Sequence, residues 1–148
     1  LGSEEGETEM VISANDSMAA STMDRGGNWL ENGTRITVPR RKLSSWLEEP
    51  VHFLKLDIEG PEVEVLEECG EKLSRVKTLF CEYHQGEKLP ASRLTRLLSV
   101  LTENGFDVQV GKSYSYQQST EYRPATFLEG SYSGVLWAKN LNWKDRQG

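Results

Sequence analysis

The segment from residue 53 to residue 66, FLKLDIEGPEVEVL, constrains the fold of this chain more than any other. Residues 51–58 are almost continuously apolar, which is typical of a strand with both faces covered, and Asp57 and Glu59 stand at its end. Pro61 then favours the start of a helix. Because open α/β sheets bind ligands outside the carboxyl ends of their parallel strands, we expect the functional residues here.

Strand and helix patterns alternate along the rest of the chain. Such a succession implies right-handed crossovers and a parallel sheet covered by helices. We therefore predict an α/β fold with a doubly wound, mostly parallel sheet and helices on both faces. The last strand has no helix before it and is predicted to run antiparallel. The predicted strands are residues 8–13, 34–38, 51–58, 76–83, 106–110 and 134–138, and short helices are expected at 41–48 and after Pro61.

Four leucines predict a further helix between residues 94 and 101. Leu94, Leu97, Leu98 and Leu101 recur at i, i+3, i+4 and i+7, and Gly105 ends the pattern. Their burial contributes about 1.5 to 3 kcal/mol each, so we assign this stripe to the core rather than to a partner.

Composition limits the classes of partner. The 148 residues carry a net charge of −6, so no long-range attraction to nucleic acid or to an anionic membrane is expected. No apolar run approaches the roughly 20 residues of a membrane span, and no signal-peptide pattern is present. The sequence does not specify the cellular compartment, and a cytoplasmic location is favoured. Cys69 and Cys81 lack metal-binding spacing and are predicted to be buried, reduced thiols.

Four ionisable residues are predicted to meet at the carboxyl ends of two strands. Side chains at i and i+2 share a face, which pairs Asp57 with Glu59 and Glu82 with His84. If the strands are neighbours, their ends lie about 4.8 Å apart. These groups could serve acid–base chemistry or hold a metal ion, but the sequence assigns no metal site. A structural alternative is open, in which Glu59 and Glu62 support the helix start and Glu82 accepts backbone N–H groups.

Other catalytic signatures are missing from the sequence. It contains no G-x-G-x-x-G, G-x-x-x-x-G-K-[ST], G-x-S-x-G or H-E-x-x-H motif. Readings as a P-loop protein or a serine hydrolase therefore have no support.

Residues 54–66, LKLDIEGPEVEVL, resemble the central signature of the FkbM-like methyltransferases. The resemblance extends to LFCEYH at residues 79–84 and to NGF at 104–106. It departs from the family pattern at Pro61, where a small Ala is usual, and at Ser44, where Asp is usual.

The resemblance implies a class I, Rossmann-like, S-adenosylmethionine-dependent fold of which this chain is the C-terminal portion, lacking the N-terminal strands. Residues 1–140 would be part of one methyltransferase domain and 141–148 a polar tail. We expect the isolated chain to be inactive, because the glycine-rich cofactor loop of the family would precede Leu1. An uncovered edge on the strand at 51–58 would also make it self-associate.

The resemblance further implies O-methylation of a hydroxyl on a small molecule or sugar, with S-adenosylmethionine as cofactor. Asp57 and His84 would be catalytic, Asp57 would also contact the cofactor, and Glu59 and Glu82 would bind the acceptor. The alternative is a non-catalytic binding module with an acidic pocket, or a degenerate relative of the enzymes.

Overall fold

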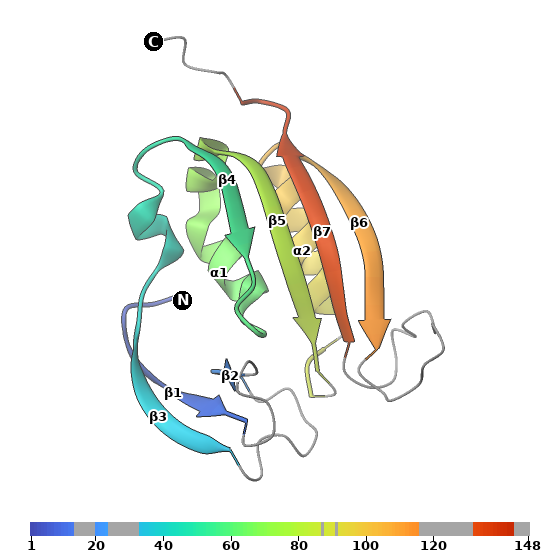
Figure 1. Cartoon of the computed structure of the whole chain (residues 1–148). Coiled ribbons are helices and arrows are strands. Elements are labelled where there is room, and N and C mark those ends of the chain that lie inside the picture. Colours follow the sequence, from blue (N-terminus) through green and yellow to red (C-terminus); the bar gives the residue numbers. More distant parts are fainter. Residues whose placement is uncertain (14–19, 24–32, 87, 91, 116–131, 144–148) are drawn as a thin grey trace.

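The computed structural model describes residues 1–13, 20–23, 33–86, 88–90, 92–115 and 132–143. Within them, a four-stranded sheet has the order β4-β5-β7-β6 and a three-stranded sheet has the order β2-β1-β3. Figure 1 shows the larger sheet with the smaller one beside its β4 end. The strands are β1 (Gly6–Ile12), β2 (Ala20–Ser21), β3 (Thr34–Arg40), β4 (Val51–Leu56), β5 (Val76–Gln85), β6 (Phe106–Ser115) and β7 (Tyr132–Asn140).

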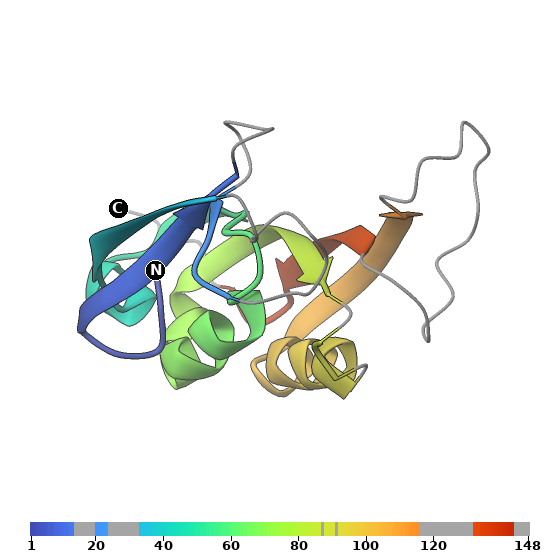
Figure 2. The same ribbon diagram turned by 90° about the horizontal axis from the view of Figure 1, so that it is seen from below.

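The prediction of a doubly wound, mostly parallel sheet is wrong. Among the described strands, only β4 and β5 pair in parallel, whereas β7 is antiparallel to both β5 and β6. The two α-helices, α1 (Glu62–Cys69) and α2 (Ser92–Glu103), lie against one face of the larger sheet rather than on both faces (Figures 1 and 2). Within this prediction, the antiparallel direction of the last strand is confirmed.

The physical reason for the correction lies in two parts of the chain. Residues 6–12 and 34–40 pair with each other as a separate antiparallel sheet instead of joining the larger sheet. The last strand then enters the larger sheet between β5 and β6, which prevents these two strands from pairing directly. No local sequence signal specifies that insertion.

Three arginines of residues 35–41 form ion pairs in or beside the smaller sheet. Arg35 pairs with Glu9, Arg40 with Glu4, and Arg41 with Glu5 across the β1–β3 sheet and its entry, so these cations balance nearby acids. The Arg41–Glu5 distance is 3.1 Å.

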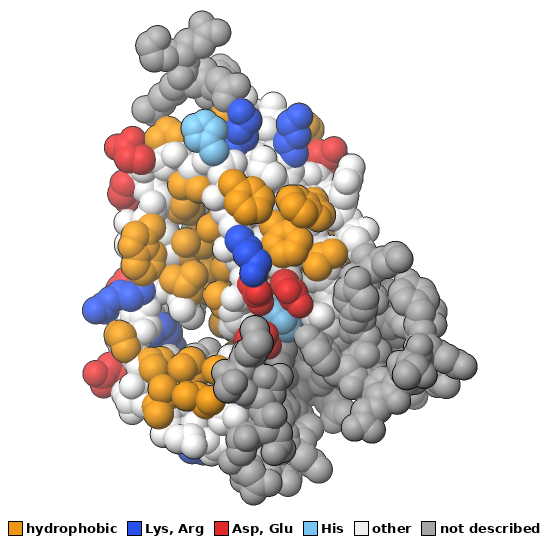
Figure 3. All heavy atoms as spheres, in the orientation of Figure 1, with side chains coloured by type: hydrophobic (Ala, Val, Ile, Leu, Met, Phe, Trp, Pro, Cys, Tyr) orange, Lys and Arg blue, Asp and Glu red, His pale blue; other side chains and the backbone are white. Residues whose placement is uncertain are grey.

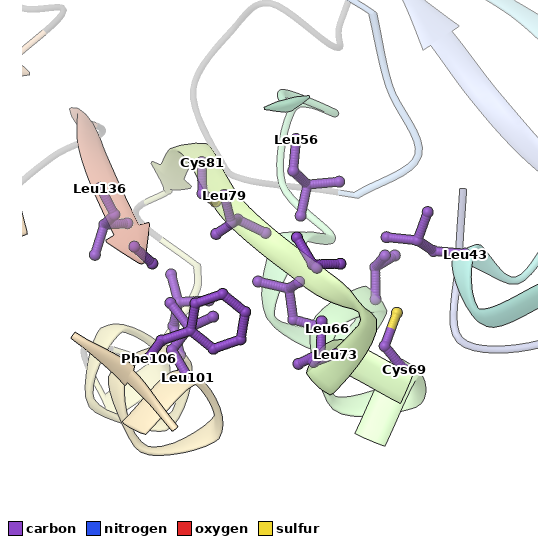
Figure 4. Packing of buried hydrophobic residues seen from close by; sticks show 14 of the residues in the cluster. Leu43, Leu56, Leu66, Cys69, Leu73, Leu79, Cys81, Leu101, Phe106 and Leu136 are labelled. Carbon is purple, nitrogen blue, oxygen red and sulfur yellow. The ribbon is translucent and has the colours of Figure 1, made fainter. Parts of the chain in front are cut away.

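The hydrophobic core lies between the larger sheet and its two helices. The pleat of β4 and β5 turns Leu56, Leu79 and Cys81 toward the helices. Leu97 and Leu101 on α2 are fully buried, and Leu94 and Leu98 pack at the edge of the cluster, which confirms the core role predicted from their spacing. Figure 4 shows side chains of the helices and of the sheet converging in this layer.

Two glycines fix the ends of the helices. α1 ends at Gly70 (φ 51°), after which residues Gly70–Arg75 form a 3-10 helix. α2 ends before Gly105, whose φ of 83° is in the left-handed region that glycine adopts without a steric penalty. The helix predicted at 41–48 is instead a short 3-10 helix, Leu43–Trp46.

Both cysteines are free and buried in this core, as predicted. Burial raises the pKa of the Cys69 thiol to about 12, and it raises the pKa of Cys81 well above its ordinary value. A thiolate is the reactive form of cysteine, so neither side chain is suited to nucleophilic or redox chemistry in the folded chain.

Among the described helices, none is long and apolar enough to cross a membrane.

Candidate functional site

The candidate site lies at the carboxyl ends of the parallel strands β4 and β5. Leu56, the last residue of β4, is in register with Cys81 of β5, so Asp57 follows one strand and Glu82 and His84 continue the other. The two strands are thus neighbours, which is the condition that the expected convergence required. We call the end of β4–β5 that carries Asp57, Glu59, Glu82 and His84 the acidic rim.

Three side chains of the acidic rim lie close enough to share one ligand. One ligating atom from each of Asp57, Glu59 and His84 lies within 4.8 Å of the others. His84 Nε2 is 3.5 Å from Glu59 Oε1 and 3.8 Å from Glu82 Oε1. The predicted convergence of these four residues is therefore correct as geometry, while their catalytic and binding roles remain predictions.

Glu59 reaches the rim by a different route from the one expected. Strand β4 ends at Leu56, and the φ of Glu59 is 60°, in the left-handed region, so the extended geometry does not reach Glu59. A non-glycine residue in such a conformation costs about 1 to 3 kcal/mol and persists only when neighbouring contacts hold it. The hydroxyl of Ser21 provides one, donating a 2.5 Å hydrogen bond to the carbonyl of Glu59.

Glu62 is a site residue whose role the sequence reading missed. Its Oε1 lies 2.8 Å from His84 Nδ1 and accepts a 2.9 Å hydrogen bond from the backbone N–H of Gly60. Both the Glu62 and His84 side chains are almost completely buried. A carboxylate in this position fixes the orientation of an imidazole ring and directs its other nitrogen outward. Here that other nitrogen faces the rim.

A signal for this role was present in the sequence. Glu62 precedes Leu66 by four residues and Cys69 by seven, which places its side chain on the buried stripe of α1 rather than on the solvent face. Acids are favoured in the first turn of a helix, which is why a helix-start role was expected for Glu62. The spacing to Leu66 and Cys69 indicates a buried side chain instead.

Arg93 of α2 holds the turn that follows β4. Its side chain is buried, and its guanidinium donates a 2.5 Å hydrogen bond to the carbonyl of Gly60 and a 2.9 Å bond to Glu64 Oε2. Arg93 thereby fixes the backbone between Glu59 and α1. The sequence reading did not identify it, because arginines are usually exposed on a helix.

Lys55 brings a positive charge to the rim. Its Nζ lies 2.8 Å from Asp57 Oδ2, and this hydrogen bond raises the pKa of Lys55. Figure 3 shows acidic side chains and a histidine gathered beside a basic side chain and a group of apolar side chains on the open face of the sheet. The lysine balances one of the carboxylates, and the rim still has an excess of acids.

A pocket of about 250 Å³ opens beside Asp57 and Glu59, between the smaller sheet and the turn after β4. Its lining combines apolar residues with two threonines, two acidic residues and one arginine. The lining residues are Leu1, Thr8, Met10, Ala20, Thr22, Val38, Pro39, Arg40, Asp57, Ile58, Glu59 and Pro61.

Comparison with known families identifies the class of protein. The family model described as the methyltransferase FkbM domain matches residues 1–108. The chain belongs to the FkbM methyltransferase family. The match covers the whole acidic rim, Glu62 and Arg93 of this FkbM methyltransferase domain, and it ends within β6. No curated protein and no solved structure matches the chain.

Membership of the FkbM family supports a methyltransferase and the presence of a methyl donor. It does not by itself specify the donor or the acceptor. The resemblance that residues 54–66 carry is confirmed by this match.

Proposed function

We propose that the protein is an S-adenosylmethionine-dependent methyltransferase that methylates a hydroxyl group of a small molecule or sugar. The observation that carries this proposal is the buried Glu62–His84 pair, which directs His84 Nε2 to the rim beside Asp57 and Glu59 in a member of a methyltransferase family. A hydroxyl acceptor must lose a proton during methylation, and this rim supplies groups that can accept it.

The residues of the rim fit the charge of the proposed donor. S-adenosylmethionine, when bound, supplies a methyl group on a positively charged sulfur. Asp57 and Glu59 line the pocket, and their carboxylates favour such a cation and would hold this part of the donor. The pocket is smaller than the roughly 300 to 1,000 Å³ usual for ligand sites. It would therefore enclose only part of the donor and acceptor together.

The pocket and the rim divide the remaining tasks. The apolar wall packs against the acceptor, and Glu59 and Glu82 accept hydrogen bonds from its hydroxyl groups. The proton of the reacting hydroxyl passes to the rim, where His84 Nε2 and the Asp57 carboxylate are the acceptors. Since alignment of donor and acceptor supplies much of the rate in such displacements, the fixed orientation of His84 contributes as well.

Single substitutions in the complete protein test this function. We expect Asp57→Asn and His84→Ala to lower kcat about 100-fold or more, the usual contribution of a positioned acid–base group. Because His84 is buried, unfolding by urea is measured in parallel to separate lost activity from lost folding. Glu71→Gln, an exposed acid away from the rim, is the matched control.

Wild-type turnover in both rim variants would reject the catalytic assignment. A complete protein that binds hydroxylated compounds in the pocket but transfers no methyl group would favour the alternative of a non-catalytic binding module.

A further inference from the structure

We propose that Asp57, Glu59 and His84 form a binding site for one divalent first-row metal ion, such as Mn²⁺. Three ligating atoms, two carboxylate oxygens and one imidazole nitrogen, lie within 4.8 Å of one another. Donor atoms around a metal ion bound at about 2.0 to 2.6 Å are separated by about 3 to 5 Å, so the observed group is close to a coordinating arrangement.

The fully buried His84 distinguishes this group from a surface cluster of acids. Its Nδ1 is hydrogen-bonded to Glu62, and its Nε2 points toward the carboxylates of Glu59 and Glu82. Histidines that bind metals commonly use one ring nitrogen as the ligand while the other donates to a carboxylate. Glu62 provides that second contact, from a position where its side chain has no exposure to solvent.

The distances across the rim leave room for an ion. His84 Nε2 is 3.5 Å from Glu59 Oε1 and 3.8 Å from Glu82 Oε1. Charge-assisted hydrogen bonds are shorter, at about 2.7 to 2.9 Å. When Nδ1 donates its proton to Glu62, the lone pair of Nε2 faces carboxylate oxygens, an arrangement that a positive ion between them stabilises.

The mixture of ligands selects the type of ion. Imidazole suits transition metals, and carboxylate oxygens also suit Mn²⁺, whereas an all-oxygen site would favour Mg²⁺ or Ca²⁺. Lys55 occupies Oδ2 of Asp57 at 2.8 Å, so the second carboxylate oxygen is the one available to coordinate. The same lysine opposes the binding of a cation by charge repulsion.

The catalytic consequence of this site rests on the proposed function, whereas metal binding itself does not. A bound ion lowers the pKa of a coordinated hydroxyl, so the acceptor would lose its proton more readily. Asp57, Glu59 and His84 would then be ligands, so the two carboxylates would hold the ion in place of the positively charged sulfur of the donor. The task of proton acceptor would pass from His84 to the neighbouring carboxylate of Glu82.

Titration of the 148-residue chain with MnCl₂ tests the site, with the free ion followed by electron paramagnetic resonance. We expect one saturable site per chain. Asp57→Asn and Glu59→Gln should each weaken binding at least tenfold, because both remove a ligand charge from a partly exposed position without opening the core. Lys55→Gln should strengthen binding severalfold, a change that a merely structural role for the rim would not produce. Glu71→Gln is the control and should leave the affinity unchanged.

Two outcomes overturn the metal site: absence of one-to-one binding at millimolar Mn²⁺, or unchanged affinity in both Asp57→Asn and Glu59→Gln. Turnover of the complete protein after chelation by EDTA separates the two proposals. Full activity without metal, together with no Mn²⁺ binding, rejects the ion and retains the methyltransferase with His84 as the direct base. Specific Mn²⁺ binding without methyl transfer to any hydroxylated acceptor rejects the proposed function and retains the site.

Discussion

Nδ1 of His84 lies 2.8 Å from Oε1 of Glu62, and neither side chain is exposed to solvent. The pair joins the end of β5 to the first turn of α1. The contact with Glu62 sets which ring nitrogen of His84 faces the acidic rim. The chemistry at the rim therefore depends on Glu62, which is not one of the rim residues.

We expect Glu62→Gln to lower the kcat of the complete protein about 10- to 100-fold, the usual effect of losing a group that orients a functional histidine. KM should change little, because Glu62 is behind the rim and does not line the pocket. Unfolding by urea should show a loss of about 1 to 3 kcal/mol for the altered buried hydrogen bonds. An unchanged kcat accompanied by the stability loss would show that Glu62 has only a structural role.

Arg93 should contribute far more stability than Arg96, although the two lie on the same helix. Arg93→Ala leaves the carbonyl of Gly60 without its 2.5 Å donor and Glu64 without its cation, so we expect a loss of about 2 to 3 kcal/mol. Arg96 pairs with Glu67 near solvent, and Arg96→Ala should cost less than about 1 kcal/mol. Chemical denaturation measures both, and equal losses would contradict the central role of Arg93.

Alkaline conditions should destabilise the chain through Cys69. Burial raises the pKa of this thiol from 9.0 to about 12. Between these values the unfolded chain has lost the thiol proton while the folded chain retains it, so the free energy of unfolding falls as pH rises. Below pH 9 both states are protonated and Cys69 has no effect on the pH dependence. The measurement is urea unfolding at pH 8 and pH 10.5.

Cys69→Ala provides the comparison for that measurement. It should lose less stability than the wild type between the two pH values, whatever its packing cost at pH 8. An identical pH dependence in the two proteins would show that Cys69 does not ionise differently on folding.

We propose that the open face of the larger sheet causes self-association through an aromatic patch, in which Phe53 and Trp137 are exposed and Phe80 is partly buried. Trp137 contacts Phe80 with ring centroids 4.8 Å apart, and Phe53 is 53% exposed. Within the described residues, β4 pairs only with β5, so one of its edges is also available. We expect the apparent mass in sedimentation experiments to rise with concentration.

Phe53→Lys should reduce this self-association, because it places a charge in the patch. Trp46→Lys alters another exposed aromatic residue outside the patch and serves as the control. A wild-type chain that sediments as a monomer at all concentrations would refute the proposal.

Local patterns predicted the elements that carry the site. The leucine spacing on α2 and the i, i+2 relation between Glu82 and His84 depend on a residue's near neighbours, and the structure retains both. The apolar run at 51–58 predicted a strand correctly, but β4 ends at Leu56 and has one open face, so the prediction that both of its faces are covered is wrong. The resemblance of residues 54–66 gave the correct family because that motif contains both the end of β4 and the start of α1.

Long-range arrangement was harder to predict. Crossover rules treat successive strands as neighbours, but β7 lies between β5 and β6 although it follows both in the chain. The contacts of Arg93 with Gly60 and of Ser21 with Glu59 likewise join segments far apart in sequence. Such contacts depend on the packed structure, and no periodicity within either segment encodes them.

The central place of β7 has a consequence for biosynthesis. The chain is made from its amino end, so β7, the strand that joins β5 to β6, is synthesised after both of them. Until then β5 and β6 cannot be linked through the sheet, and their unsatisfied edges are accessible to chaperones and proteases. Premature termination before residue 132 would therefore remove the middle of the sheet rather than its margin, and quality control should clear such products quickly.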